Sequence, residues 1–124
     1  GNFGMTGGQM AWTTMPGQKT ATSPKGRDCA MTGIPIKVPE LIAYSFTPAY
    51  VARGAVTTPA EINRLKGYIK NAIEAQLNGE GYSMVEVMCS CPTNWNLNPI
   101  DAKQRLADEV IPYYSLGEIK KRGE

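Results

Sequence analysis

A long amphipathic segment between two apolar runs restricts the fold of this chain more than any other feature. Thr58 is followed by Pro59 and then by Glu61, an order typical of a helix that begins at Pro59, with Thr58 as its N-cap and Glu61 able to reach back to the Thr58 amide. Asn78 and Gly79 supply the stop signal. Apolar residues recur at spacings of three, four and seven, which predicts one stripe that faces a core: Ile62, Leu65, Ile69, Ala72, Ile73 and Leu77.

The apolar runs on either side of this helix predict buried strands. The first covers residues 49–53 and ends at Gly54, and the second covers residues 82–89. A strand, a helix and a second strand in this order predict a βαβ unit with parallel strands and a right-handed crossover. Two parallel strands leave edges and faces uncovered, so we expect further strands from upstream of Gly1 or from another copy.

Weaker signals predict the remaining elements of an α/β region over residues 36–112. A helical pattern covers residues 36–44, with Pro39 near its first turn. Another helix is expected from an Asn98 cap, with Pro99 in its first position, to a point near Pro112, because the residue before a proline avoids the α conformation. Residues 113–124 are expected to form an extended tail.

A glycine-rich loop stands at the start of the chain, within residues 1–10. Gly4, Gly7 and Gly8 surround Met5 and Thr6 and are followed by Gln9, so the loop carries little side-chain bulk. Its backbone N–H groups can approach an anion closely, and the Thr6 hydroxyl adds a donor. The alternative is a plain turn, in which Gln9 only braces the loop.

Residues 11–35 show neither a helical nor an alternating apolar period, and five prolines and glycines would interrupt either element: Pro16, Gly17, Pro24, Gly26 and Gly33. We therefore expect an irregular arm. A flexible surface linker is one interpretation, and a lid or an intersubunit arm is the other, which the position directly after the glycine loop favours.

Composition excludes several classes of function. The net charge of +2 and the lack of a basic block with interleaved aromatics argue against a nucleic-acid partner. No run of about 18 apolar residues and no charged-then-apolar leader occur, so neither a membrane span nor a signal peptide is expected. Three cysteines do not suggest a disulfide framework and favour the cytoplasm. The absence of histidine removes most general-base and hydrolase schemes.

Several motifs together resemble the carboxy-terminal part of the thiamine-diphosphate-binding β subunit of 2-oxoacid:ferredoxin oxidoreductases, in the branch that acts on 2-oxoglutarate or 2-oxoisovalerate. The resemblance covers nearly all 124 residues. It is carried by residues 2–9 (NFGMTGGQ), by three pieces of the arm (PGQ at 16–18, GRD at 26–28, GIPI at 33–36), by residues 85–95 (VEVMCSCPTNW), and by YVARG at 50–54 and IPYYSLG at 111–117.

The resemblance implies an α/β fold: the carboxy-terminal portion of a thiamine-diphosphate-binding domain, with a parallel sheet, a βαβ unit and a long irregular amino-terminal arm. It implies coenzyme A-dependent oxidative decarboxylation of a 2-oxoacid, with ferredoxin as the electron acceptor. The cofactors would be thiamine diphosphate, Mg²⁺ and a [4Fe–4S] cluster, and the other subunits of the oxidoreductase would be partners. The protein's part would be to bind and orient these groups.

The same resemblance assigns roles to individual residues. Gly4, Thr6, Gly7, Gly8 and Gln9 would bind the diphosphate, and the backbone carbonyl of Asn2 would be one Mg²⁺ ligand. The remaining Mg²⁺ ligands would lie before Gly1, so this chain is expected to hold the cofactor poorly alone.

Two further residues have an alternative role each. Met5 would line the substrate beside the reactive centre, and the alternative is that it packs the loop. Cys91 would be the last ligand of the cluster, and the alternative is a small buried hydrophobe. Cys29 and Cys89 are expected to be structural.

Two other hypotheses remain open at this level. One is a non-catalytic α/β module that binds a phosphate or a protein partner through the glycine loop and the arm. The other is a fragment that is inactive in isolation. Exposed sheet edges and a long arm also favour self-association of such a fragment.

Overall fold

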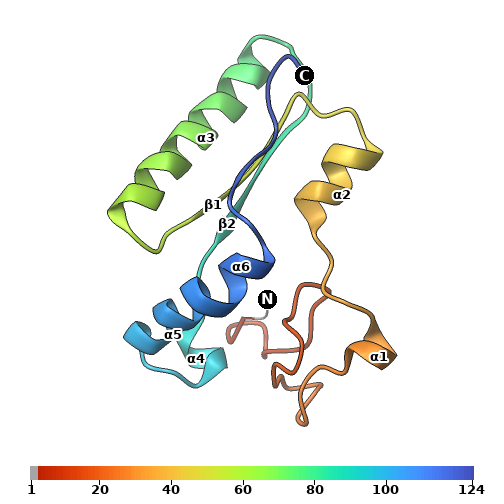
Figure 1. Ribbon diagram of the computed structural model, residues 1–124, viewed down its shortest axis with the longest axis vertical. Coiled ribbons are helices and arrows are strands. Elements are labelled where there is room, and N and C mark those ends of the chain that lie inside the picture. The colour runs from red at the N-terminus through yellow and green to blue at the C-terminus, as the bar shows by residue number, and fades with distance from the viewer. Residues whose placement is uncertain (1–2) are drawn as a thin grey trace. The chain divides into compact units, whose positions relative to one another are not determined.

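The computed structural model describes residues 3–124, which form two compact units (Figure 1). One unit contains the residues up to Lys37 together with Ser90–Arg105, and the other contains Val38–Cys89 with Leu106–Glu124. The second unit holds the sheet, and the first holds the glycine loop, the arm and Cys91.

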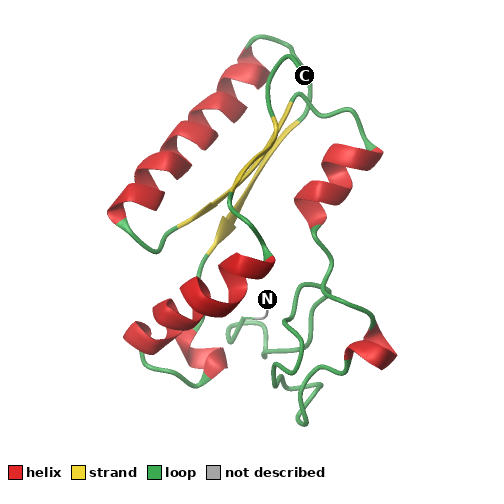
Figure 2. Ribbon diagram, in the orientation of Figure 1, coloured by secondary structure: helices red, strands yellow, loops and turns green. Residues whose placement is uncertain are grey.

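The predicted βαβ unit is confirmed in the second unit (Figure 2). Strands β1 (Tyr50–Ala55) and β2 (Ser83–Met88) are parallel, in register from the pair Tyr50–Ser83 to the pair Ala55–Met88, and helix α3 (Pro59–Leu77) connects them. β1 does not end at Gly54 as predicted. A Cβ at Gly54 would lie 2.8 Å from the Leu65 side chain, so the glycine is there because α3 packs closely on the strand.

The tail forms a third strand, which the sequence did not predict. β3 (Gly117–Lys120) pairs antiparallel with β1, so the strand order is β2-β1-β3 and the sheet is mixed rather than parallel. Every residue of β1 is buried. A buried central strand needs both of its edges paired, and the tail of the chain supplies the second partner.

Helix α3 begins as predicted, but its buried face differs from the predicted stripe. The Thr58 hydroxyl accepts a hydrogen bond from the Glu61 amide (3.2 Å), while the Glu61 carboxylate pairs with Arg64 instead of reaching back to Thr58. The residues that pack on the sheet are Leu65, Tyr68, Ala72 and Ala75. Four residues of the predicted stripe are 37–80% exposed: Ile62, Ile69, Ile73 and Leu77. The apolar face of α3 is wider than three strands can cover.

Helix α2 (Val38–Ser45) confirms the pattern predicted over residues 36–44 and lies on the face of the sheet opposite to α3 (Figure 1). Helix α5 (Pro99–Arg105) is capped by the Asn98 side chain, which accepts from the Asp101 amide at 2.9 Å. Two short helices, α1 (Cys29–Thr32) and α4 (Pro92–Trp95), were not predicted.

Helical backbone ends at Tyr113, close to Pro112 as predicted, although it includes the proline rather than stopping before it. A π-helical stretch, η1 (Leu106–Val110), is followed by α6 (Ile111–Tyr113). Proline cannot donate to the carbonyl four residues earlier, and its ring crowds that carbonyl. The wider π turn accommodates both effects.

Arg53 is a charged residue in the centre of the second unit. Its side chain is fully buried, and its guanidinium pairs with Glu40 on α2 (2.5 and 2.7 Å) and with Glu86 on β2 (2.5 Å). It also donates to the Ser115 carbonyl (3.1 Å) and lies over the Tyr114 ring. Burial alone would lower the pKa of Arg53, but the two carboxylates outweigh that effect and raise it. One side chain therefore ties β1 to β2, α2 and the chain after α6.

Tyr50 gives a prediction about alkaline stability. Its side chain is fully buried, and its hydroxyl forms no hydrogen bond of standard geometry among the described residues, although Asn71 and Glu118 lie near it. Burial raises the pKa of Tyr50 to about 12. A raised pKa favours folding below the unfolded value of about 10 and is lost as the pH rises toward 12. We expect about 2 kcal/mol of unfolding free energy to be lost across this interval.

Chemical denaturation of wild type and Tyr50→Phe at pH 9 to 12 measures this loss. The variant should match or exceed the wild type at pH 9, since it removes an unpaired polar group, and should lose less stability as the pH rises. Equal losses in the two proteins would assign the alkaline sensitivity to other groups.

Candidate functional site

The glycine loop is one tight turn closed by its own backbone. The Gly7 amide donates to the Gly4 carbonyl (3.0 Å) and the Gly8 amide to the Phe3 carbonyl (2.9 Å), the pattern of bonds that ends many helices. Gly7 and Gly8 both have positive φ, which explains why glycines stand there. The Thr6 hydroxyl donates to the Phe3 carbonyl (3.3 Å). Two predicted anion donors, the amides of Gly7 and Gly8, are thus used inside the turn.

Cys91 lies against this loop although 87 residues separate it from Gly4 in sequence. The Gly4 amide donates to Cys91 Sγ (N···S 3.4 Å). A Cβ at Gly4 would lie 3.3 Å from the Thr93 side chain, and one at Gly8 would lie 1.9 Å from Asn94 Nδ2. The glycines therefore allow the loop backbone to pack directly on the segment that begins at Cys91. The fold brings together two of the motifs that the sequence singled out separately.

Helix α4 holds this segment in place. Cys91 is its N-cap residue and its carbonyl accepts from the Trp95 amide (3.0 Å), while Asn96 ends the helix in the left-handed conformation. The Arg105 guanidinium lies over the Trp95 ring at 4.9 Å. Trp95 Nε1 is buried without a hydrogen-bond partner among residues 3–124. An unpaired buried donor close in sequence to Cys91 is a group that a bound anion or sulfide would satisfy.

The arm is irregular, as predicted, but it is held by a dense set of hydrogen bonds. The buried Arg27 guanidinium donates to the carbonyls of Ala11, Trp12 and Thr14, with N···O distances of 2.7–3.2 Å. It also donates to Thr32 and Gly33. This network favours a fixed loop over the flexible-linker interpretation.

The arm also braces the glycine loop. The Ala21 amide donates to the Gly8 carbonyl (2.9 Å), and the Met10 amide donates to the Thr22 hydroxyl (2.9 Å). The resemblance placed Thr93, Asn94 and Trp95 around the end of the cluster without a role for each. Arg27 belongs to one of the motifs that carry the resemblance, GRD at 26–28, but the sequence did not predict that it holds the arm together.

The other predicted site residues are placed as follows. Met5 is fully exposed at the tip of the glycine loop, and Gln9 is exposed beyond it. Asn2, the predicted Mg²⁺ ligand, lies outside the described residues. Cys29, Cys89 and Cys91 are all free thiols. Within residues 3–124 no three Cys, Asp or Glu side chains are grouped as a complete metal site would require.

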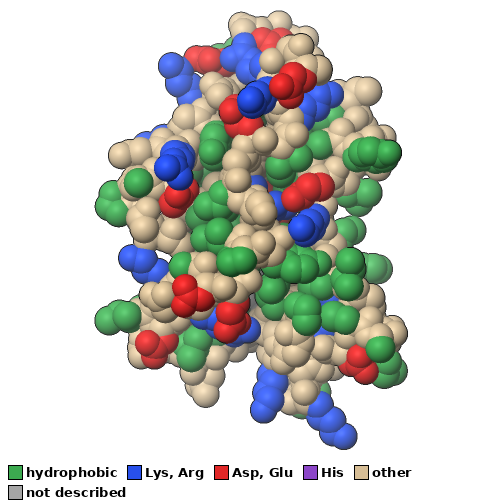
Figure 3. All heavy atoms as spheres, in the orientation of Figure 1, with side chains coloured by type: hydrophobic (Ala, Val, Ile, Leu, Met, Phe, Trp, Pro, Cys, Tyr) green, Lys and Arg blue, Asp and Glu red, His purple; other side chains and the backbone are tan. Residues whose placement is uncertain are grey.

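Charges of both signs are mixed on the face drawn in Figure 3, and hydrophobic side chains reach the surface between them. In the described part of the chain, no helix is both long enough and apolar enough to cross a membrane.

Comparison with known proteins identifies the class of protein. The chain is 38% identical over 120 residues to ketoisovalerate oxidoreductase subunit VorA of Methanothermobacter thermautotrophicus, covering 97% of this chain and 25% of that protein. It is 36% identical over 106 residues to 2-oxoglutarate synthase subunit KorB of Archaeoglobus fulgidus, covering 86% of this chain and 35% of that protein. It is 32% identical over 106 residues to pyruvate synthase subunit PorB of Pyrococcus furiosus, covering 86% of this chain and 30% of that protein.

No family model and no solved structure matches the chain. The chain spans a quarter to about a third of the length of these curated relatives. It belongs to the family of 2-oxoacid:ferredoxin oxidoreductase subunits, as the motifs in its glycine loop and around Cys91 predicted.

Proposed function

We propose that this chain is part of the thiamine-diphosphate-binding β subunit of an oxidoreductase for coenzyme A-dependent oxidative decarboxylation of a branched 2-oxoacid or 2-oxoglutarate. The names of its relatives, a ketoisovalerate oxidoreductase and a 2-oxoglutarate synthase among them, support this substrate class. When bound, thiamine diphosphate would supply the carbanion chemistry and an iron–sulfur cluster would carry single electrons to ferredoxin.

The observation that carries the proposal is the packing of the glycine loop on the Cys91 segment. A loop that binds a diphosphate and a cysteine that binds a cluster must lie close together if electrons are to pass between the two cofactors. The Gly4 amide and Cys91 Sγ are in hydrogen-bond contact, and Gly8 lies against Asn94. In this arrangement the chain's own residues would orient the diphosphate and the cluster against each other.

The residues present fit one corner of a cluster site. Cys91 is half-buried, its sulfur accepts an amide N–H, and an unpaired indole N–H lies four residues on. Donors of this kind stabilise the negative charge on a cluster and its thiolates. A cluster needs four thiolates, so three would come from other parts of the subunit.

The glycine loop offers fewer free donors to a diphosphate than its sequence predicted. Because the Gly7 and Gly8 amides bond within the turn, the donors left for an anion are the amides of Met5 and Thr6, which have no partner among the described residues. The Thr6 hydroxyl forms only a long bond to Phe3, so it can be redirected to a phosphate oxygen. We propose that Met5, fully exposed at the tip, lines the substrate.

Other subunits and ferredoxin are the proposed partners. Three large apolar side chains of the arm unit are mostly exposed, which favours an intersubunit role for the arm: Trp12 (78%), Met31 (85%) and Ile34 (76%). The cytoplasm is the proposed location, and three free thiols agree with a reducing compartment.

The test uses the anaerobically purified enzyme that contains this chain. Cys91→Ser should lower the iron content by one cluster and remove the matching electron paramagnetic resonance signal, whereas Cys29→Ser and Cys89→Ser should leave both unchanged. In calorimetry with Mg²⁺ and thiamine diphosphate, Thr6→Val should weaken binding about fivefold, the loss of one hydrogen bond. An unchanged iron content in the Cys91→Ser enzyme would refute the proposal that Cys91 binds the cluster. An unchanged affinity for thiamine diphosphate in the Thr6→Val enzyme would refute the proposal that Thr6 binds the diphosphate.

A further inference from the structure

We propose that Trp95 donates its indole N–H to a sulfur of the cluster held by Cys91 and thereby raises the reduction potential of that cluster, and that Arg105 positions the indole for this bond. The inference rests on the proposed function, in which Cys91 is a cluster ligand. It gives an individual role to Trp95, which the family resemblance placed at the end of the cluster without one.

Helix geometry directs the Trp95 side chain toward Cys91. Cys91 is the N-cap residue of α4, and its carbonyl accepts a hydrogen bond from the amide of Trp95 (3.0 Å), four residues later. Residues four apart share one face of a helix. Aromatic side chains in helices also lean toward the N-terminus, over the residue four positions earlier. The indole is therefore the large side chain of α4 on the side of the cysteine.

The indole N–H is a donor that needs an acceptor from within the site. Trp95 Nε1 is shielded from solvent and forms no hydrogen bond among residues 3–124. A buried donor that stays unpaired destabilises the fold, and water cannot satisfy a donor that it does not reach. A cysteine thiol is only a weak acceptor, whereas the thiolate and the sulfides of a cluster are charged and accept strongly. Cluster binding at Cys91 would supply the missing acceptor.

The two residues before Trp95 have a different partner, the glycine loop. A Cβ at Gly4 would lie 3.3 Å from the Thr93 side chain, and one at Gly8 would lie 1.9 Å from Asn94 Nδ2. The Gly4 amide already donates to Cys91 Sγ (3.4 Å), so this sulfur has one N–H donor from the backbone. The indole would add a second donor at the same corner of the cluster.

Arg105 holds the plane of the indole. It is the last residue of α5, in the same compact unit as α4, and its guanidinium carbon lies 4.9 Å from the centre of the Trp95 ring. A cation over the face of a tryptophan is attracted by the π electrons of the ring. The contact uses the face of the ring and leaves the N–H on its edge available. Arg105 is therefore a positioning residue that acts through the indole.

The expected effect is on the reduction potential. Reduction adds negative charge to the cluster sulfurs, so a hydrogen-bond donor stabilises the reduced state more than the oxidised state. Trp95→Phe keeps an aromatic ring and removes the donor. We expect the ratio of reduced to oxidised cluster at a fixed potential to fall about tenfold, which lowers the midpoint potential of a one-electron couple by about 59 mV.

Arg105→Met should lower the same ratio by a smaller factor, about threefold, because the indole is no longer held in place. Since Arg105 acts through the indole, adding Arg105→Met to Trp95→Phe should give no further decrease. A further decrease in the double variant would overturn the positioning role, because it would show that the charge of Arg105 acts on the cluster directly.

The measurements use the anaerobically purified enzyme that contains this chain. Potentiometric titration followed by electron paramagnetic resonance gives the midpoint potential. Electron–nuclear double resonance on enzyme labelled with nitrogen-15 in the indole ring detects a nitrogen that is hydrogen-bonded to the reduced cluster. The wild-type enzyme should show an indole coupling, and Trp95→Phe should lose it.

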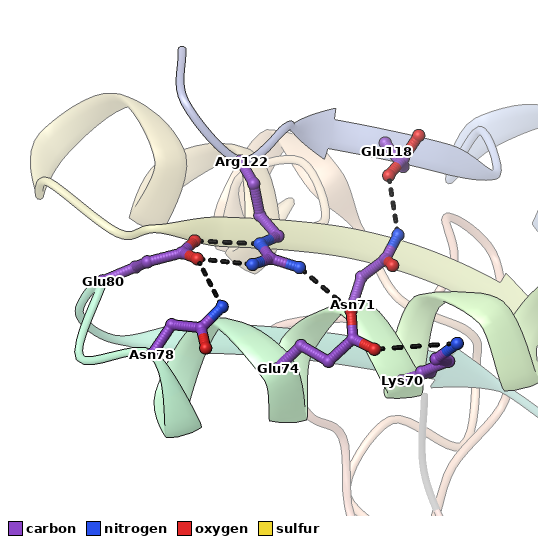
Figure 4. Close-up of polar contacts among 7 residues, drawn as sticks. All are labelled: Lys70, Asn71, Glu74, Asn78, Glu80, Glu118 and Arg122. Atoms are coloured by element: carbon purple, nitrogen blue, oxygen red, sulfur yellow. Dashed lines mark hydrogen bonds and ion pairs between the residues drawn. The ribbon is translucent and has the colours of Figure 1, made fainter.

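Two variants are matched controls. Trp12→Phe replaces the other tryptophan of the chain, which is 78% exposed on the arm, and should leave the midpoint potential and the indole coupling unchanged. Arg122→Met removes an arginine whose guanidinium pairs with the carboxylates of Glu74 and Glu80 (Figure 4). It should leave the midpoint potential unchanged, because those partners do not belong to the Cys91 segment.

The absence of an indole coupling in the wild-type enzyme would overturn the proposal, whether or not the Trp95 variant folds. An unchanged midpoint potential in Trp95→Phe would overturn it as well. Failure of the proposed function has a different signature, an unchanged iron content in Cys91→Ser. Loss of the cluster in Cys91→Ser together with an unchanged potential in Trp95→Phe would refute the role of Trp95 alone.

Discussion

Replacing Arg53 with methionine is expected to lower the free energy of unfolding by about 3 kcal/mol. The substitution leaves Glu40 and Glu86 facing each other across the space that the guanidinium filled. The loss should fall at the low end of the range for broken buried pairs, because the two carboxylate side chains are 37% and 22% exposed and regain some water. Urea denaturation followed by circular dichroism measures the change.

Two comparisons isolate the origin of that loss. Arg64→Met breaks an exposed pair with Glu61 and should cost under about 0.5 kcal/mol. Adding Glu40→Gln and Glu86→Gln to Arg53→Met should recover part of the stability, because it removes the uncompensated charges. A loss below about 1 kcal/mol for Arg53→Met would mean that the buried guanidinium does not hold the unit together.

The second large effect is expected at Gly8, where the loop meets the Cys91 segment. An alanine there would place its Cβ 1.9 Å from Asn94 Nδ2 and would adopt a φ of +69°. We expect Gly8→Ala to lower the free energy of unfolding by about 3 kcal/mol. About 1 kcal/mol of this comes from the left-handed backbone conformation and the rest from displacing Asn94. Chemical denaturation measures the loss.

Gly17 is a matched control for this substitution. It has the same φ of +69°, but a Cβ there would meet no atom within 4 Å. Gly17→Ala should therefore cost only about 1 kcal/mol. In a background with Asn94→Ala, the cost of Gly8→Ala should fall to the same value. Equal losses of unfolding free energy for Gly8→Ala and Gly17→Ala in the presence of Asn94 would show that the contact between Gly8 and Asn94 does not affect stability.

Local signals in the sequence predicted the elements whose causes are local. The Thr58 cap, the proline after it and the stop at Asn78 defined α3, and the apolar runs defined β1 and β2. The glycine loop and Cys91 were both singled out, and the family they indicated is confirmed by the relatives. The roles of Gly4, Met5, Thr6, Gly7, Gly8, Gln9 and Cys91 in binding remain predictions.

Features of the fold that depend on partners far away in the sequence were not predicted. β3 looked like a tail because four residues carry no period of their own, and they become a strand only by pairing with β1. The α3 stripe was assigned to the core because helical spacing shows which residues are apolar but not how many strands lie beneath them. Arg53 and Arg27 could not be read as buried residues, since their partners are far away in sequence or are backbone carbonyls.

By itself, the sequence determined the βαβ unit, the irregular arm and the family, because capping, periodicity and motif spacing are properties of neighbouring residues. The tertiary structure alone decided that the tail completes the sheet, that Arg53 is neutralised from two sides, and that Gly4 donates to Cys91 across 87 residues. These contacts join segments that have no local preference for each other. They form because burial requires each backbone group and each charge to find a partner wherever the fold brings one within reach.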